Sequence, residues 1–323
     1  MEPGLSGVEV VVDDAGSAVV RWATAGEGSV ALATGRTPDP SEHIHVVTVS
    51  ISEGSARLAA VPAGRFYVSI TSGGTTLVVA ERRVRFSGPG NFRDLGGYRI
   101  RSGGATRWGR VFRADNLHHL TADDLVIFDA LGIGAIYDLR RDDERVEEPG
   151  PRAFVGLPLS SRRVSDAAKR TLVDRQAGER WLFDDYCGML ADAGPVFGRI
   201  FSDLADPDAP PTVFHCAGGK DRTGLTAALM LSWLGVERET VLDDYELTGI
   251  FNSGKRLRRI EDMFVEGGIA RPTAQGLLSA PRWAMADALT VLDDDYGGIE
   301  AYLRGPAHMT TTALENLRTR LIA

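Results

Sequence analysis

The sequence predicts an α/β protein in which helices cover both faces of a sheet, preceded by a small all-β domain. Three observations lead to this fold class. Short β-branched or alternating runs separated by turn residues fill the first 86 residues. Glycine and proline then cluster at residues 87–90, which is typical of a domain boundary. Beyond that point strand patterns alternate with helical patterns. We therefore expect an accessory domain over residues 1–86 and a second domain over residues 87–323.

Short strands are expected throughout the first domain. They are residues 8–12, 18–23, 29–34, 45–50, 56–59, 65–72 and 75–86. Turn signals, among them residues 13–16, separate them. So many short strands in so short a segment predict a β-sandwich, and Trp22 with the run at 66–68 resembles the fibronectin type III layout. Such a module could bind a partner, or it could serve only for packing and solubility. A truncated chain that begins near Gly88 is expected to fold without it.

The second domain shows alternating helix and strand patterns. A helix is expected after Thr121, a capping residue followed by apolar residues at helical spacing. Residues 135–139 and 154–159 are strand candidates, and most of the charged run between them fits a solvated helix start. Residues 161–180 have no strong pattern. Further helices are expected within residues 181–204 and at 239–251, 254–264, 281–292, 299–303 and 311–321.

The chain is organised around residues 212–225. A short apolar run at 212–214 follows two prolines and predicts a buried strand. Residues 225–234 predict an apolar helix that ends at Gly235. Only a tight loop fits between the two elements. A strand, a glycine-bearing loop and a helix N-terminus form an anion cradle, because backbone N–H groups and the helix dipole attract negative charge.

The side chains of this loop indicate a nucleophile inside a phosphate-binding nest. Cys216 ends the strand, where a helix N-terminus and nearby cations favour the thiolate. Arg222 follows after five residues, and a curled loop brings its guanidinium over the same point, where it can hold two phosphate oxygens. The glycines at 218–219 let an anion approach the amides. Thr223 can place a hydroxyl near the sulfur, and His215 can orient the cysteine through the backbone.

Other interpretations of the loop fit less well. A Walker A loop requires serine or threonine after its Gly-Lys pair, and Asp221 stands there. A papain-like nucleophile needs neither the arginine nor the glycines. A rhodanese-type sulfur transferase also uses a cysteine loop, but the K-D-R-T-G run at residues 220–224 disfavours it. An inert buried cysteine is the remaining alternative.

The run H-C-A-G-G-K-D-R-T-G at residues 215–224 resembles the H-C-x-A-G-K-D-R-T-G form of the Cys-x5-Arg signature. That form marks the bacterial tyrosine/lipid phosphatase group of the protein tyrosine phosphatase superfamily; Gly218 stands where it usually has alanine. Three further segments are similar to the group. They are N-F-R-D-L-G-G at 91–97, R-V-F-R-A-D at 110–115, with alanine for the usual serine, and I-Y-D-L-R at 136–140. The resemblance covers residues 87–323.

The resemblance implies a tyrosine phosphatase-like sheet and hydrolysis of phosphate monoesters through a phosphocysteine intermediate, without metal or cofactor. Phosphotyrosine is the expected substrate, and dual specificity would add phosphoserine, phosphothreonine and phosphoinositides. The phosphate is expected to lie on the loop residues Ala217, Gly218, Gly219, Lys220, Asp221 and Arg222. The alternative is a catalytically weak pseudophosphatase that binds phospho-ligands, which the intact Cys216 and Arg222 disfavour.

The roles of the other site residues rest on the resemblance. No Trp-Pro-Asp sequence occurs, so Asp221 is expected to be the general acid, unless it only braces the loop. Arg93 and Asp94 either pack beside the phosphate loop or form a structural ion pair. Asp138 is expected to support the wall of the site. Lys220 is expected to act as an extra cation that favours phosphoinositides.

Composition narrows the function classes. The net charge of −8 argues against a nucleic-acid binder. The two cysteines, Cys187 and Cys216, are too few for a disulfide framework, and their small number suits a reducing compartment. Cys187 is either a core residue or a redox partner of Cys216. No apolar stretch predicts a transmembrane helix and no Sec signal is visible, so a cytoplasmic location is expected, with export by another route left open. Basic residues within 255–259 form either a solvated helix face or a rim that attracts phosphoinositides, and the partner of the β-domain stays unknown.

Overall fold

The computed structural model describes residues 6–12, 17–23, 27–59, 61, 64–159, 164–252 and 254–323. The turn predicted at residues 13–16 lies outside the described residues, as do the side chains at positions 255 and 256 of the predicted basic cluster.

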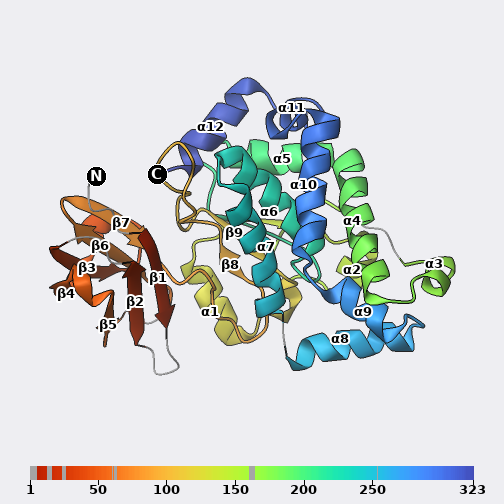
Figure 1. Ribbon diagram of the computed structural model, residues 1–323, viewed down its shortest axis with the longest axis horizontal. Coiled ribbons are helices and arrows are strands. Elements are labelled where there is room, and N and C mark those ends of the chain that lie inside the picture. Colours follow the sequence, from red (N-terminus) through yellow and green to blue (C-terminus); the bar gives the residue numbers. More distant parts are fainter. Residues whose placement is uncertain are drawn as a thin grey trace.

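The first part of the chain forms two antiparallel sheets, drawn in red and orange in Figure 1. Its strands are β1 (Ser6–Val12), β2 (Ala18–Ala23), β3 (Ser29–Gly35), β4 (Ile44–Ser50), β5 (Ser55–Leu58), β6 (Tyr67–Ser72) and β7 (Thr75–Val79). One sheet has the order β1-β2-β5 and the other β4-β3-β6-β7. A single apolar cluster, which includes Val20, Leu32 and Ile70, takes side chains from both sheets. The predicted strands are confirmed, although the last one ends at Val79.

The segment between the sandwich and the second sheet is firmly packed. Val84 and Phe86 belong to one apolar cluster with Phe92, and the rings of Phe86 and Phe92 meet edge to face at 4.8 Å. The backbone N–H of Gly88 donates to the Asp124 carboxylate at 2.9 Å. The glycine- and proline-rich stretch is therefore anchored to the second domain.

The central sheet of the second part has the order β11-β10-β12-β9-β8. Its strands are β8 (Arg93–Asp94), β9 (Val111–Ala114), β10 (Ala135–Asp138), β11 (Val155–Gly156) and β12 (Thr212–His215). β9 to β12 are parallel, and β8 runs antiparallel to β9. Side chains alternate between the two faces: Ile136 and Val213 pack with Phe128 of α1 (Ala122–Ala130), whereas Tyr137 and Phe214 face the larger core.

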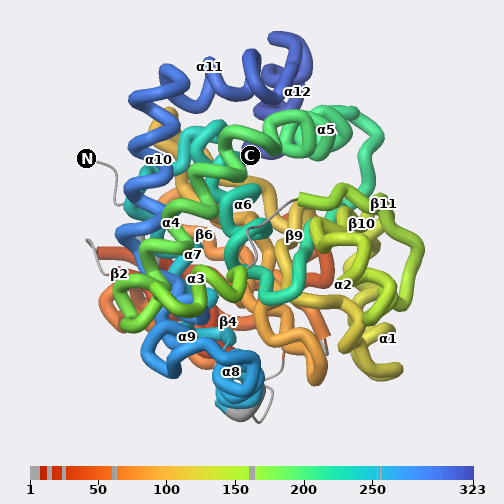
Figure 2. The backbone as a smooth tube through the Cα atoms, turned by 90° about the vertical axis from the view of Figure 1, so that its right-hand side faces the viewer, coloured from red at the N-terminus to blue at the C-terminus, as the bar shows by residue number. Residues whose placement is uncertain are grey.

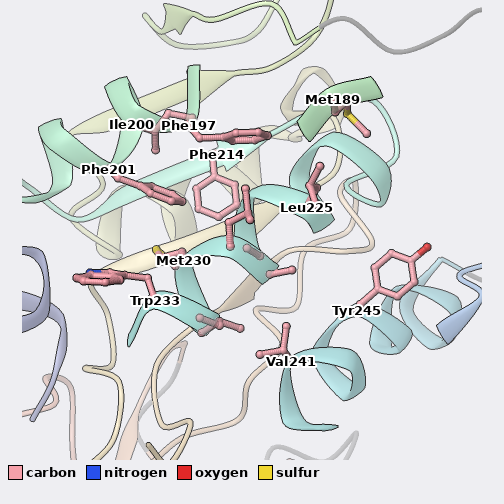
Figure 3. Close-up of a cluster of buried hydrophobic side chains, with 14 of the residues drawn as sticks. Met189, Phe197, Ile200, Phe201, Phe214, Leu225, Met230, Trp233, Val241 and Tyr245 are labelled. Carbon is pink, nitrogen blue, oxygen red and sulfur yellow. The ribbon is translucent and has the colours of Figure 1, made fainter. Parts of the chain in front are cut away.

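Helices cover both faces of this sheet, as predicted. Besides α1 they are α2 (Asp142–Glu147), α3 (Asp166–Thr171), α4 (Arg175–Asp192), α5 (Gly194–Leu204), α6 (Asp221–Leu234), α7 (Arg238–Phe251), α8 (Lys255–Glu266), α9 (Arg271–Leu278), α10 (Arg282–Tyr296), α11 (Ile299–Arg304) and α12 (Thr311–Leu321). Figure 2 shows α4, α6 and α7 side by side, with α8 and α9 below them. In the larger core Phe214 lies among Phe197, Ile200 and Phe201 of α5 (Figure 3).

Three helical segments are absent from the sequence prediction. α3 and the first turns of α4 occupy residues that carry no strong pattern, because their exposed faces dilute the apolar spacing. α9 is a short helix that packs against α4 and α8. α6 begins at Asp221 rather than at residue 225, so the first helical turn is itself part of the loop. No helix in the described part of the chain is long and apolar enough to cross a membrane.

Candidate active site

The loop between β12 and α6 folds tightly around Cys216. Cys216 is 2% exposed and has a free thiol. Gly219 adopts a φ of +64°, and a Cβ there would lie 2.6 Å from the carbonyl oxygen of Ala114. Both observations require glycine at position 219, since the left-handed conformation and the close backbone approach exclude a side chain.

The loop turns its carbonyl groups outward. Three successive carbonyl oxygens accept hydrogen bonds from residues outside the loop. The bonds are Asn116 N to Ala217 O (3.1 Å), Asn252 Nδ2 to Gly218 O (2.7 Å), Asn91 Nδ2 to Gly219 O (3.0 Å) and Arg113 Nη2 to Gly219 O (2.8 Å). Because a peptide N–H points away from the preceding carbonyl, the loop amides are left to face the interior of the nest. This orientation suits an anion.

Arg222 is held in place by Glu144 of α2. Its Nη1 donates to Glu144 Oε2 at 2.7 Å and its Nη2 to Glu144 Oε1 at 3.0 Å. Burial opposes ionisation of Glu144, but the bonds from Arg222 and Arg141 keep its pKa below the usual value. Although burial acts against it, the electrostatic interaction with Cys216 and the hydrogen bonds to Glu144 raise the pKa of Arg222. The guanidinium is therefore charged and fixed in one plane beside the loop.

His215 stays neutral behind the loop. Burial lowers its pKa to about 4, although the Asp138 carboxylate, 3.6 Å from its Nε2, acts in the opposite direction. Its Nδ1 lies 3.4 Å from the carbonyl oxygen of Cys216, consistent with the predicted orienting role. Asp138 is fully buried and accepts hydrogen bonds from Arg140 on both oxygens, at 3.0 and 2.6 Å. Asp138 thus supports His215 and the end of β10.

Two buried arginines share one carboxylate beneath the loop. Asp244 of α7 accepts Arg93 Nε at 3.0 Å and Arg113 Nη1 at 2.5 Å, and Tyr98 donates its hydroxyl at 2.7 Å. Burial and the nearby Arg93 lower the pKa of Arg113 to about 10, so the guanidinium stays charged at neutral pH. Although burial opposes it, the two arginines hold the pKa of Asp244 far below its usual range. The cluster carries one net positive charge, and Arg113 touches the loop through Gly219.

Arg93 and Asp94 point to different places. Arg93 joins the cluster beneath the loop, and its Nη1 also contacts the side chain of Asn91. Asp94 instead forms an ion pair with Arg65 of the sandwich at 3.0 Å. It also accepts the backbone N–H groups of Gly96 and Gly109, at 2.8 and 2.9 Å. The structure therefore places Asp94 at the junction of the two parts rather than in the site.

Lys220 does not point into the nest. Its Nζ donates to the carbonyl oxygens of Leu277 and Ser279, at 2.5 and 2.7 Å, and lies 3.4 Å from Asp221 Oδ1. The side chain is buried, and it ties the loop to the end of α9. Thr223 is fully buried, and its hydroxyl has no hydrogen-bond partner among the described residues, which leaves it available to a group bound in the loop.

Asp221 occupies the first turn of α6 beside Arg222. Its Oδ1 accepts the hydroxyl of Tyr186 of α4 at 2.7 Å. The Asp221 side chain is 29% exposed, so a substrate can reach it. Cys187 lies on α4 as well, where burial and three nearby aspartates raise the pKa of its thiol. That environment favours the core-residue interpretation of Cys187 over a reactive thiol.

Sequence reasoning missed several residues that shape this site. Glu144, Asp244 and Tyr186 stand far from the signature in the sequence and have no motif of their own. Glu144 had a partial signal, because an acidic residue three positions after the start of a predicted helix often caps that helix. In the structure Glu144 accepts the backbone N–H of Arg141 at 2.9 Å, but nothing in the sequence indicated its contact with Arg222. For Asp244, the signal is that a buried arginine requires a carboxylate, but nothing in the sequence says which one.

Comparison with known proteins shows which proteins this chain resembles in sequence. A tyrosine-protein phosphatase of Nostoc commune is 27% identical over 220 residues, which cover 65% of this chain and 73% of the relative. A putative tyrosine-protein phosphatase of Cupriavidus necator is 28% identical over 70% of this chain and 85% of its own length. A triple specificity protein phosphatase of Mycobacterium tuberculosis is 26% identical over 67% of this chain and 91% of its own length. The model of the tyrosine phosphatase family matches residues 84–323, and the chain therefore belongs to the tyrosine phosphatase family, whose members are phosphoric monoester hydrolases.

Proposed function

We propose that this chain hydrolyses phosphate monoesters in two steps with Cys216 as the nucleophile. The thiolate attacks phosphorus in line, so that an S–P bond forms while the bond to the leaving oxygen breaks. Water then attacks the phosphocysteine and releases inorganic phosphate. Arg222 and the loop amides hold the equatorial oxygens and bind the trigonal-bipyramidal transition state best. The observation that carries the proposal is the outward turn of the carbonyls at residues 217–219, which leaves the loop amides facing the cysteine end of the nest.

Asp221 is the proposed general acid. It stands next to Arg222, is accessible, and has no ion pair that occupies both of its oxygens among the described residues. Asp138, the other carboxylate expected at the site, is fully buried and bonded through both oxygens by Arg140, which disfavours it as a proton donor. A positioned acid contributes roughly 10²- to 10⁴-fold to the rate.

The proposed substrates are phosphotyrosine first, with phosphoserine, phosphothreonine and phosphoinositides as further classes. The relatives are tyrosine-protein phosphatases by name, and one is named for triple specificity. The cations proposed to meet a multiply phosphorylated headgroup are Arg258 and Arg259, which are exposed on α8, because Lys220 is already bonded. A rate panel of phosphotyrosine peptides, phosphoserine peptides and phosphoinositides tests this, and Arg258→Gln with Arg259→Gln should lower only the phosphoinositide rates.

The nucleophile is tested with p-nitrophenyl phosphate in EDTA. Cys216→Ser should lose turnover and keep phosphate binding, because the backbone and Arg222 remain. Cys187→Ser is the matched control and should keep wild-type turnover, since it lies on α4 outside the loop. Turnover by Cys216→Ser would contradict the mechanism. Phosphate binding without turnover in the wild type would favour the pseudophosphatase alternative.

For the first part of the chain we propose a fibronectin type III-like sandwich over residues 1–86. Its sheets have three and four strands, and Trp22 is buried with its Nε1 bonded to Ile51 O at 2.9 Å. The packing of Val84 and Phe86 with Phe92 favours a domain boundary a few residues earlier than residue 87. A crystal structure of the chain, superposed on fibronectin type III domains, tests the sandwich assignment.

A further inference from the structure

A pair of buried tyrosines lies directly behind Asp221. Tyr186 comes from α4 and Tyr245 from α7, and neither side chain is exposed. Their hydroxyl oxygens lie 2.6 Å apart and their rings meet edge to face at 6.2 Å. The Tyr186 hydroxyl is also 2.7 Å from Asp221 Oδ1. Figure 3 shows Tyr245 on α7 with its hydroxyl directed away from the apolar cluster.

The directions of these hydrogen bonds follow from proton counting. A phenol has one O–H to donate. Tyr186 donates its proton to Asp221, so Tyr245 must donate to Tyr186. Burial first, and then the interaction with the neighbouring Asp221, raise the pKa of both phenols well above the usual value. The hydroxyls therefore stay protonated at any working pH, and the pair acts as a fixed donor.

The two oxygens of Asp221 are not equivalent. Oδ1 accepts the Tyr186 hydroxyl and lies 3.4 Å from Lys220 Nζ. Among the described residues, no hydrogen bond or ion pair reaches Oδ2. A carboxylic acid whose Oδ1 is filled by donors carries its own proton on the other oxygen.

We propose that Tyr186, itself held by Tyr245, is a positioning residue that keeps the proton of Asp221 on Oδ2, the oxygen open to the leaving group. This inference rests on the proposed role of Asp221 as general acid. As the bond between phosphorus and the leaving oxygen breaks, the Oδ2 proton passes to that oxygen and Asp221 becomes a carboxylate. The Tyr186 hydrogen bond to Oδ1 strengthens as this charge develops, because bonds to an ionised acceptor are stronger. In the second step the carboxylate takes a proton from the attacking water, which restores the acid.

Other charged groups lie near Asp221 or act on the tyrosine pair. Arg222 and Lys220 are its neighbours in the chain, and Glu179 of α4 and Arg113 of β9 act on Tyr245 from further away. None of them changes between the wild type and a tyrosine-to-phenylalanine variant. The pH profiles of such variants therefore report the lost hydroxyl.

The test compares Tyr186→Phe and Tyr245→Phe with a matched control, Tyr302→Phe. Tyr302 is equally buried and donates its hydroxyl to Leu190 O at 2.8 Å, away from the loop. Rates are measured on aryl phosphates whose leaving groups range from phenol to 2,4-dinitrophenol. Tyr186→Phe should lower the phenyl phosphate rate by roughly 10- to 100-fold, and the dinitrophenyl phosphate rate by much less. Its pH–rate limb for the essential acid should move to higher pH. Tyr245→Phe should show the same changes to a smaller extent, and Tyr302→Phe none of them.

An equal loss on all leaving groups, with an unmoved pH profile, would overturn the positioning role of Tyr186. The Asp221→Asn variant separates this failure from failure of the proposed function. If Asp221→Asn shows a steep dependence on the leaving group and Tyr186→Phe does not, only the tyrosine inference fails. If Asp221→Asn loses activity uniformly, the acid assignment itself fails. In the Asp221→Asn background, Tyr186→Phe should add no further dependence on the leaving group.

Discussion

Arg65 of the sandwich is expected to stabilise the whole chain because it neutralises a carboxylate buried in the second part. The side chains of Arg65 and Asp94 are 8% and 0% exposed, with 3.0 Å between Nη2 and Oδ2. Arg65 also donates to the carbonyl oxygen of Glu81. Burial raises the pKa of Asp94, against the bonds from Arg65, Gly96 and Gly109. Arg65→Ala leaves the carboxylate without its nearest cation, and breaking a buried pair costs about 3–5 kcal/mol.

Urea unfolding at pH 7, followed by tryptophan fluorescence, measures this loss. The lower end of the range is expected, because the two backbone N–H groups still bond Asp94. Arg21→Ala is the control: its ion pair with Glu9 spans 3.8 Å, and both side chains are about 60% exposed. Removing such a pair costs about 1 kcal/mol or less. If Arg65→Ala and Arg21→Ala lose the same small amount, the reasoning is refuted.

The pH dependence of the same variant gives a second readout. A buried carboxyl whose folded pKa is raised destabilises the protein above that pKa, and the penalty disappears as the pH falls below the unfolded value of about 3.9. Loss of Arg65 raises the pKa of Asp94 further. The gap in stability between the wild type and Arg65→Ala should therefore narrow as the pH falls from 7 toward 4. A gap that stays constant would mean that the carboxylate is not the source of the loss.

The same contacts argue against the expectation that a truncated chain beginning near Gly88 folds. Such a truncation removes Arg65 together with Val84 and Phe86, which are 4% and 9% exposed in the cluster around Phe92. Burial of each apolar side chain contributes about 1.5–3 kcal/mol. Added to the unpaired carboxylate, the loss reaches about 6–11 kcal/mol, which is comparable to the whole stability of a typical domain. Cooperative unfolding of residues 88–323 with the stability of the full chain would contradict this estimate.

Three further predictions concern the loop. Gly219→Ala should lower turnover by about 100-fold, because the added Cβ would collide with the backbone of Ala114. Gly218→Ala is the control: nothing lies within 4 Å of a Cβ at that position, so this variant should keep the melting temperature of the wild type. Lys220→Ala should reduce phosphotyrosine and phosphoinositide turnover equally, because the Lys220 ammonium bonds carbonyl oxygens at the end of α9 and does not face the nest. A selective loss of phosphoinositide turnover would instead support the sequence-based prediction that Lys220 favours phosphoinositides. His215 binds a proton near pH 6.5 in the unfolded chain but only at about pH 4 in the folded protein. The free energy of unfolding should therefore fall by about 3 kcal/mol as the pH drops through this window. The urea midpoint should fall less over the same pH range in His215→Asn than in the wild type.

The sequence was most informative where chemistry and local structure coincide. Cys216, Arg222 and the glycines of the loop could be predicted because one continuous stretch contains the strand, the turn and the helix start. The short strands of the sandwich could be predicted because β-branched runs alternate with turn residues. Both signals act within about fifteen residues of the chain, which is the range over which periodicity carries information.

The partners of the buried charges could not be predicted from the sequence. Arg93 reaches Asp244 across 151 residues, and Arg113 reaches the same carboxylate across 131. Any of the 44 acidic residues could have served, because the choice depends on how α7 packs under the loop. For Asp94 the motif left two interpretations open, a place beside the phosphate loop or a structural ion pair, and its side chain forms an ion pair with Arg65. Adjacent residues in a strand point to opposite faces, so motif membership does not place both side chains at one site.

The cluster beneath the loop shows why this anion site needs more than the residues of its signature. Arg93 and Arg113 share the single charge of Asp244, so one positive charge remains in a region without solvent. Leaving a buried charge uncompensated is unfavourable for an empty protein. The same charge becomes favourable when a thiolate or a phosphate dianion occupies the loop, because Coulomb attraction is strong where water is excluded. Arg113 contacts the loop directly, since it bonds Gly219 O and so fixes a peptide whose N–H is proposed to face the anion. We therefore expect the unbalanced positive charge of this cluster to stabilise the charged states through which the proposed reaction passes.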